Sequence, residues 1–536
     1  MTQTIQRKLN DYAWARWSAM VLIALMMLFA HMFVDVISPI KELMQIQRGW
    51  TSDIFGTFAG SEYFLNTCGF LIIAGIILDK MGIRFTGVTS AIVMIAGAGI
   101  KFYAVSDWFT GTALAEWLNS WWTAMPASAK LASFGFMIFG CGAEMAGITA
   151  SKALAKWFEG KEMALAMGLE MALTRVSVFI IFTISPRIAG IGGLDESIVR
   201  PVAFCAALLV IGLLCYLVFC VMDKKLDKQL GANAVQGESE EEFKFSDILT
   251  IFKSKLFWIV AMLCVLYYSA IFPFQKFAAN MLQSNLGLTA TSASDIFRWF
   301  PIGAACVTPF LGWFLDKKGK GASMLILGSL LMIACHLIFA LVLPLYPNKI
   351  IAYAAILLLG VSFSLVPASL WPSIPKIMDK RFLGSAYSLI FWVQNFGLMG
   401  MPILIGWALE KCNPGVAEKI AAAAEKAATN TEQVAAVAEQ CTPEVAEQVA
   451  AVAEQCTPEV AEQVAAVAEQ CTPEVAEQVA ASVEQIATVA ESATYNYTVP
   501  MLIFASLGGL ALLFSLLLKA MDKRNGYGLE LPNIKE

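Results

Sequence analysis

Apolar and polar residues alternate along this chain in blocks the length of whole helices. Long apolar stretches, each close to the roughly 20 residues that a helix needs to cross a bilayer core, are separated by short polar loops. The pattern predicts about twelve membrane-spanning helices, at 17–40, 54–78, 85–105, 131–154, 163–189, 199–222, 255–283, 290–315, 322–345, 349–374, 383–410 and 497–520. We expect an all-α membrane protein with these helices in two pseudo-symmetric bundles of six.

One polar loop occurs twice, after the second span of each set. Residues 75–84 read GIILDKMGIR, and residues 312–320 read GWFLDKKGK. Each copy has an aspartate at the end of an apolar run and a glycine that permits a tight turn. The repetition indicates a duplicated membrane domain. The loop resembles that of the major facilitator superfamily, a resemblance that implies a transporter, and we assign Asp79, Arg84 and Asp316 to a gate at this end of the bundles.

Five segments follow from these boundaries. They are an N-terminal bundle at 1–222, a cytoplasmic linker at 223–253, helices seven to eleven at 254–410, an acidic insert at 411–496, and the last helix with its tail at 497–536. The insert repeats the sequence CTPEVAEQVAAVAEQ from Cys441, Cys456 and, in part, Cys471. Thr-Pro at each start favours the beginning of a new helix, so we expect several short helices or a kinked hairpin. We interpret the insert as an external spacer in preference to a partner-binding module.

Composition agrees with a membrane protein. The chain is 58% hydrophobic and 15% charged, whereas soluble proteins average about 25% charged residues. Residues 412–492 hold 14 Glu and two Lys, a local charge of −12 within a total of −5, which leaves +7 for the rest. That positive charge is spread over short loops, so we expect no nucleic-acid partner. No nucleophile–base pattern, phosphate loop or metal spacing stands out, and we predict no enzyme activity, cofactor or metal.

Orientation is predicted from Lys and Arg, which gather in the even-to-odd loops and at both chain ends. Both termini should therefore be cytoplasmic. The N-terminal tail carries no acidic dileucine sorting signal, and we expect a multi-pass monomer in a bacterial cytoplasmic membrane.

Charged residues inside apolar spans are the candidates for function, because each costs at least about 2.5 kcal/mol at the bilayer centre without a partner or water. Glu144 and Arg175 lie on adjacent predicted spans. They could form a permanent ion pair that locks the two spans together. They could instead part to hold the ammonium and carboxylate of a zwitterion.

Three further residues are candidates for proton coupling. His31 and Asp35 are four residues apart and share a helix face, and Glu62 is a third titratable group in an apolar span. An imidazole beside a carboxylate can relay protons; a hydrogen-bonded histidine without that role is the equal alternative. Lys276 follows Pro273, which can interrupt span seven, and broken helices at mid-membrane often line substrate sites. Lys276 could instead extend to the outer surface.

A narrower resemblance rests on several segments, namely WFEGKE at 157–162 with Gly168, Leu169 and Arg175, YYSAIFPF at 267–274, LWP at 370–372, LGSAY at 383–387 and QNFGL at 394–398. Together they resemble the lysosomal dipeptide transporter branch of the superfamily. That branch uses a glutamate in span four and an arginine in span five, and Glu144 and Arg175 match them. The predicted substrate site comprises Glu144, Arg175, Lys276, Tyr267, Trp371, Gln394 and Asn395.

The sequence therefore predicts a secondary active or facilitative transporter that works by alternating access in a lipid bilayer. We expect a small zwitterionic solute as cargo, dipeptides before amino acids. The alternatives are a small organic anion as cargo, or a transporter-like sensor or assembly factor that uses the external repeat.

Overall fold

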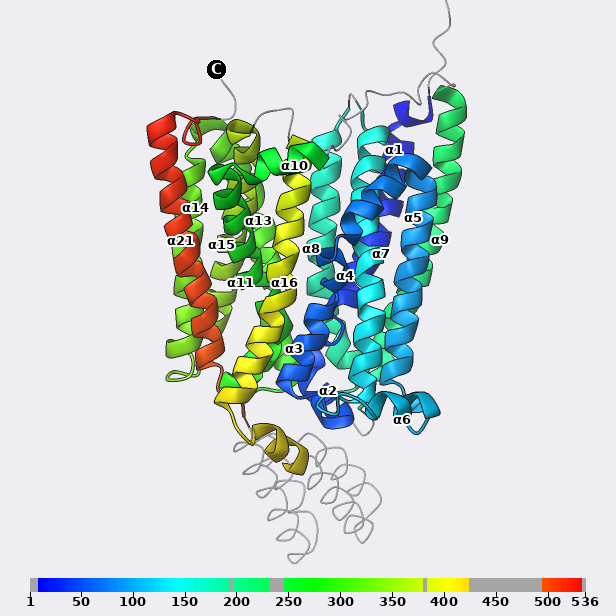
Figure 1. The fold of residues 1–536 in the computed structure, drawn as a ribbon, viewed down its shortest axis with the longest axis vertical. Coiled ribbons are helices and arrows are strands. Elements are labelled where there is room, and N and C mark those ends of the chain that lie inside the picture. The colour runs from blue at the N-terminus through cyan, green and yellow to red at the C-terminus, as the bar shows by residue number, and fades with distance from the viewer. Residues whose placement is uncertain are drawn as a thin grey trace, which may run out of the picture.

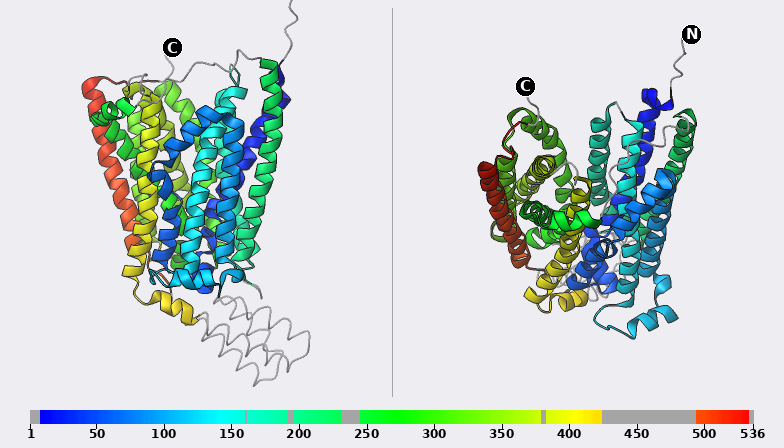
Figure 2. Two further views of the ribbon diagram at one scale, coloured as in Figure 1. Left: turned by 45° about the vertical axis from the view of Figure 1, so that its right-hand side comes forward. Right: turned by 45° about the horizontal axis from the view of Figure 1, so that its top comes forward.

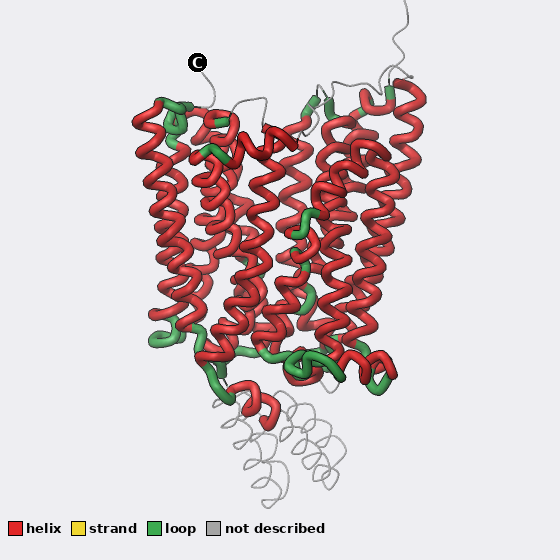
Figure 3. Tube along the Cα trace, viewed as in Figure 1, coloured by secondary structure: helices red, strands yellow, loops and turns green. Residues whose placement is uncertain are grey.

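The computed structural model describes residues 8–159, 161–191, 196–230, 245–378, 383–423 and 494–532. This part of the chain contains helices and loops but no strand (Figure 3). The helices stand side by side in two bundles (Figure 1). Within these described ranges, ten helices are long and apolar enough to cross a membrane. The predicted all-α membrane fold is confirmed.

The N-bundle is formed by the helices that precede residue 231. Its members are α1 (Ala13–Asp35), α3 (Ser52–Ser61), α4 (Phe64–Thr67), α5 (Phe70–Val105), α7 (Ala127–Trp157), α8 (Met163–Ala189) and α9 (Val199–Leu230). α1 packs on α8 and α9, and α5 packs on α7 and α9. α9 continues to Leu230, so the first residues of the predicted linker belong to a helix.

The C-bundle is formed by the remaining long helices. Its members are α11 (Lys255–Leu286), α12 (Ala290–Phe297), α13 (Phe300–Lys318), α14 (Gly321–Leu337), α15 (Lys349–Ile377), α16 (Leu383–Cys412) and α21 (Thr498–Asn525). α11 packs on α16 and α21, α13 packs on α15, and α14 packs on α15 and α21.

Gly82 divides α5 into two arms that run in opposite directions. Its φ of +76° lies in a region that favours glycine, which accounts for the glycine in the repeated loop. The first arm completes the second pass of the chain and the second arm makes the third. With both arms of α5 and the α12–α13 segment included, the described chain makes the twelve predicted passes.

The two ends of the molecule differ in what they carry. The terminal face carries η1 (Leu9–Asp11), α10 (Phe245–Phe252) and the residues after α21 (Figure 1). The far face carries α2 (Lys41–Arg48) and α6 (Ala113–Asn119). Residues 416–423 of the insert form a helix beyond the far face. The repeats that start at Cys441, Cys456 and Cys471 lie outside the described residues.

The bundles meet most closely in the half of the molecule towards the far face, where α3 packs on α16. A Cβ atom at Gly56 would lie 2.2 Å from the Pro402 carbonyl oxygen, and one at Gly406 would lie 2.2 Å from that of Ser52. Figure 2 shows this packing region from two further directions. Small residues at these positions let the two backbones touch.

Three passes differ from the prediction. The eighth, predicted as one helix over 290–315, is divided into α12 and α13. Pro273 could have interrupted span seven, but α11 is continuous through it. Neighbouring helices bury α11, and buried surroundings can satisfy the backbone groups that proline frees. The second pass, predicted as one helix over 54–78, is instead divided into α3, α4 and the first arm of α5. Glu62 lies at its first break, as the C-cap of α3.

Candidate substrate site between the bundles

Arg175 lies near the middle of α8, and its side chain reaches the C-bundle. Its guanidinium carbon is 4.6 Å from the ring centroid of Phe363 in α15 and 5.5 Å from that of Phe272 in α11. Both contacts are cation–π interactions, which hold the guanidinium without using its N–H groups. Among the described residues Arg175 has no hydrogen bond or ion pair. Its donors are therefore available to a ligand.

Glu144 lies near the middle of α7, half-buried. It is close enough to Glu62 for the two carboxylates to interact electrostatically. In the part of the chain that the structure describes, no ion pair joins Glu144 to Arg175 or to any other cation. The permanent pair considered from the sequence is not the arrangement found here.

Aromatic side chains of α11 and α15 lie beside Arg175. Trp371 of α15 donates its indole N–H to the Tyr268 hydroxyl at 3.2 Å, and Tyr268 stacks on Phe272. Tyr267 was predicted for this site, but its hydroxyl bonds to Leu325 and Ser329 of α14, inside the C-bundle. Consecutive helical residues point about 100° apart, so only one tyrosine of the pair can face the N-bundle. That residue is Tyr268.

Gln394 and Asn395 lie on α16 and are buried. The Cys264 thiol donates to Gln394 Oε1 at 3.0 Å, which is a contact within the C-bundle. Neither residue contacts Arg175 or Glu144 through a hydrogen bond among those described. That Gln394 and Asn395 bind the substrate stays a prediction.

Lys276 joins the two bundles through a buried ion pair. Its Nζ atom is 2.9 Å from Asp35 Oδ1 at the end of α1 and 3.9 Å from Glu62 Oε2. Gln275 also donates to Asp35. The Lys276 side chain is 6% exposed, so it does not extend to the outer surface. Lys276, Asp35 and Glu62 lie between the Arg175 region and the far face, and we call them the far-face ion cluster.

His31 does not contact Asp35 through a hydrogen bond in the described chain. Its Nδ1 atom is 2.8 Å from the Met27 carbonyl oxygen, one turn earlier in α1. Asp35 instead turns to Lys276 and Gln275 of the other bundle. The geometry of this state therefore matches the hydrogen-bonded histidine more closely than the His31–Asp35 relay.

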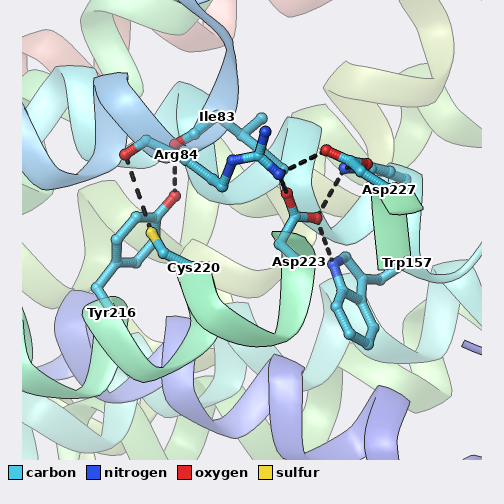
Figure 4. Close-up of polar contacts among 8 residues, drawn as sticks. Ile83, Arg84, Trp157, Tyr216, Cys220, Asp223 and Asp227 are labelled. Carbon is cyan, nitrogen blue, oxygen red and sulfur yellow. Dashed lines mark hydrogen bonds and ion pairs between the residues drawn. The ribbon is translucent and has the colours of Figure 1, made fainter. Parts of the chain in front are cut away.

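The predicted gate residues lie at the terminal face. Asp79 forms an exposed ion pair with Lys152 of α7. Arg84 Nη1 donates to Asp223 Oδ2 at 3.0 Å and also contacts Asp227, both in α9 (Figure 4). These contacts stay within the N-bundle. The Asp316 side chain lies outside the described residues, and the gating role of all three stays a prediction.

Asp223 is the centre of this network. Besides Arg84, it accepts hydrogen bonds from Lys156 Nζ at 2.7 Å and from the Trp157 indole at 3.0 Å (Figure 4). Its side chain is 1% exposed. Three donors from α5 and α7 thus compensate one buried carboxylate of α9.

A second set of ion pairs ties the start of the chain to the loop between α7 and α8. Arg16 pairs with Glu162, and Lys161 pairs with Asp11, each at 2.9 Å. A hydrogen bond from the Glu162 backbone and one from Arg16 lower the pKa of Glu162. Hydrogen bonds from Lys161 and from the Lys8 backbone lower the pKa of Asp11. Both pairs again lie within the N-bundle.

Sequence reasoning overlooked several residues of this region. Lys101 lies inside the predicted span 85–105 and should have been counted among the membrane charges. Asp223 was assigned to a linker because its helix was ended too early. Phe272 and Phe363 gave no signal, since phenylalanine is common in apolar spans. No group of three or more His, Cys, Asp or Glu residues in the described chain could hold a metal ion.

Comparison with known proteins gives a family and a set of relatives. The sequence model of the Major Facilitator Superfamily matches residues 23–402. The lysosomal dipeptide transporter MFSD1 of Danio rerio is 28% identical over 345 residues, which are 63% of this chain and 68% of that protein. The same transporter of Homo sapiens is 26% identical over 288 residues, 52% of this chain and 59% of that protein. The matches thus span about two thirds or less of these relatives.

Solved structures share the fold. A bacterial homologue of the human lysosomal transporter Spinster, in an inward-facing and unoccupied conformation, has a TM-score of 0.57 at 14% identity, with 94% of this chain and 98% of that chain covered. The nucleoside transporter NupG has a TM-score of 0.58 at 12% identity, with 95% and 99% covered. At these identities the likeness concerns the fold alone.

Proposed function

Because this chain belongs to the Major Facilitator Superfamily and is a membrane transporter, not an enzyme, we propose that it carries a small zwitterionic solute by alternating access. One observation carries the proposal. Arg175 and Glu144 are opposite charges near the middle of adjacent helices, and among the described residues neither has an ionic partner. A ligand with a carboxylate and an ammonium group would compensate both.

Arg175 suits the carboxylate end of such a ligand. Its planar fork can donate two parallel hydrogen bonds to a carboxylate. The rings of Phe272 and Phe363 hold the guanidinium plane, so less conformational freedom is lost on binding. Glu144 would accept the ammonium group. We place dipeptides before amino acids because the matched relatives are named as dipeptide transporters.

We infer from the distribution of Lys and Arg that the terminal face is cytoplasmic. The bundles are joined by hydrogen bonds towards the far face, such as Lys41 to Asn280 at 3.1 Å and Gln283 to Glu42 at 2.9 Å. The ion pairs described at the terminal face each stay within one bundle. On this assignment the protein is in an inward-facing state. We also propose that it is a monomer and that its membrane is a bacterial cytoplasmic membrane.

Uptake of radiolabelled dialanine into proteoliposomes tests the proposal. The wild-type protein should accumulate or equilibrate the dipeptide and should be inhibited by other unblocked dipeptides. In Glu144→Gln, the concentration of unlabelled dialanine that halves uptake should rise about tenfold, because a charge-assisted hydrogen bond worth roughly 1.5 kcal/mol is lost. Inhibition by N-acetyl-dialanine, which lacks the ammonium group, should change little.

Glu170→Gln is the matched control, since Glu170 is a half-buried carboxylate of α8 and lies about 140° around the helix from Arg175. Its effect on both inhibitors should be small. Equal losses for dialanine and its acetylated analogue would remove Glu144 from ammonium recognition and favour a small organic anion as cargo. No uptake of any zwitterion by folded protein would favour the sensor or assembly role.

A further inference from the structure

Lys101, in the second arm of α5, is fully buried in the N-bundle. Its Nζ atom has no hydrogen-bond acceptor among the described residues. It lies 4.4 Å from the ring centroids of Phe33 and Phe136 and 5.0 Å from that of Phe58. The three rings come from α1, α7 and α3. They form an aromatic cage around an amine that has no carboxylate partner at ion-pair distance.

Such an amine has two accessible protonation states. As an ammonium ion it is stabilised by the ring faces but lacks any acceptor for its three donors. As a neutral amine it removes an uncompensated charge from an apolar site. Lysine differs from arginine in this respect, because a buried lysine gives up its proton readily.

Glu62 provides a second incompletely bonded group in the same region. Its Oε2 atom is buried without a hydrogen bond in the described chain and is 3.9 Å from Lys276 Nζ. The charged or titratable groups that act on Lys101 are Lys276 of α11, Glu62 after α3, Cys205 of α9 and Asp35 of α1. From α7, Glu144 acts on Glu62.

Lys276 is the one member of this set that belongs to the C-bundle. Asp35, Glu62 and Lys101 all move with the N-bundle. The positive charge of Lys276 is therefore beside Glu62 and near Lys101 only while the bundles are closed at the far face. In alternating access, opening of that face must separate Lys276 from Asp35 and Glu62.

We propose that Lys101 and Glu62 form a proton-binding site, and that the return of Lys276 on closure of the far face expels one proton and so couples transport to proton movement. With the far face open, the N-bundle holds Asp35 and Glu62 without Lys276, and a proton from water on that side binds the Lys101 Nζ lone pair. On closure, Lys276 compensates both carboxylates and repels the Lys101 ammonium. The proton then leaves through Glu62 and the Glu144 region to the terminal side.

One proton thus moves from the far face to the terminal face in each cycle, together with substrate. The inference rests on the transport function proposed above and adds proton symport to it. The device differs from a His31–Asp35 relay, since Asp35 acts as the fixed counter-charge of Lys276 and His31 is not required.

The test uses full-length protein in proteoliposomes that contain a trapped pH-sensitive dye. External dialanine should drive proton entry through the wild-type protein, and an imposed pH gradient, acidic outside, should drive dialanine accumulation. In Lys101→Met, the proton flux driven by dialanine should be at least tenfold lower than in wild type, and an imposed pH gradient should drive no dialanine accumulation. Its dialanine counterflow, which needs no net proton transfer, should stay within about threefold of wild type.

Lys130→Met is the matched control, because Lys130 is a buried lysine whose Nζ donates to the Leu118 and Trp121 carbonyls. The Lys130→Met protein should still couple dialanine transport to proton movement. If Lys101→Met does not fold, Glu62→Gln should show the same loss of coupling. Lys101→Arg keeps a charge that cannot be released and should also be uncoupled; a coupled Lys101→Arg protein would show that the cage holds a permanent cation and would overturn the proposal.

Wild-type protein gives an outcome that needs no variant. Dialanine transport without proton movement would overturn the proton site and leave the proposed substrate unaffected. Absence of any dialanine transport would instead reject the proposed function itself. Full coupling in the folded Lys101→Met protein would show that the proton binds elsewhere, for example at Glu144.

Discussion

Arg175 presents its hydrogen-bond donors to the space between the bundles because aromatic rings, not acids, hold its guanidinium group. Aromatic rings also surround the Lys101 amine, which is fully buried. The two residues differ in chemistry. Arginine keeps its charge and presents a flat fork, whereas lysine can change its charge. We therefore assign ligand recognition to Arg175 and proton exchange to Lys101.

Arg175→Lys should weaken dialanine binding about tenfold or more. The variant keeps the positive charge but loses one of two parallel hydrogen bonds, each of roughly 1.5–3 kcal/mol for charged partners. Binding to purified protein, measured by calorimetry, checks this. Arg187→Lys is the control on the same helix, since Arg187 pairs with Asp295 near the far face and should leave the affinity unchanged. Wild-type affinity in folded Arg175→Lys protein would contradict the assignment.

Asp223→Asn should destabilise the N-bundle by about 2 kcal/mol. The change removes the charge that compensates Arg84, Lys156 and the Trp157 indole (Figure 4), and hydrogen bonds to charged groups contribute roughly 1.5–3 kcal/mol each. A lower melting temperature of the purified protein reports the loss. Asp227→Asn should have a smaller effect because Asp227 is 34% exposed and solvent screens its pairs. A larger loss of stability in Asp227→Asn than in Asp223→Asn would contradict the central role of Asp223 in this network.

At the scale of helices, contact between the bundles depends on α3 and α16. These helices can touch because glycine occupies the contact positions of both, and no side chain intervenes. The break in the second pass directly after α3 then places Glu62 beside the C-bundle. Close packing and the far-face ion cluster thus depend on the same short helix.

Gly56→Ala should prevent full closure of the far face. The added methyl carbon would lie 2.2 Å from the Pro402 carbonyl oxygen, so the backbones must separate. Amide hydrogen exchange in α3 and in the second half of α16 should become faster, and dialanine transport should fall. Gly400→Ala is the control, because its Cβ would meet nothing within 4 Å. Unchanged exchange in Gly56→Ala would show that the helices already have room.

At the scale of the whole molecule, the described residues at the two ends of the acidic insert meet at the far face. Asn413 Nδ2 donates to the Asn496 carbonyl at 3.1 Å, and the Asn496 backbone N–H donates to Asn413 Oδ1 at 2.7 Å. The two ends of the insert are therefore held together at its base. This contact links the end of α16 to the start of α21, and the spacer role of the insert stays a prediction.

Replacement of residues 424–490 by a short Gly-Ser linker should leave dialanine uptake within about twofold of wild type, because loop length has a weak effect on closure entropy and the Asn413–Asn496 contact remains. Uptake per folded molecule in proteoliposomes is the measurement. Asn413→Ala within the shortened protein should lower the melting temperature, as the two ends separate. A folded deletion protein without uptake would show that the repeats take part in transport.

The sequence alone was enough to predict the number of membrane passes, the two bundles and the transporter family, although not the bounds of every helix. The reason is that a bilayer demands long apolar runs, and a duplicated loop records the duplication directly. It also made Glu144 and Arg175 candidates for the substrate site, since a charge in an apolar span stands out; their role stays a proposal.

Only the tertiary structure decided which groups meet. Lys276 and Asp35 are 241 residues apart, and nothing in either local sequence names its partner. Whether Tyr267 or Tyr268 faces Arg175 depends on the rotation of α11, and whether Glu144 pairs with Arg175 depends on how far α7 and α8 stand apart. Such distances and rotations arise from packing among many distant residues, so no local pattern of residues contains them.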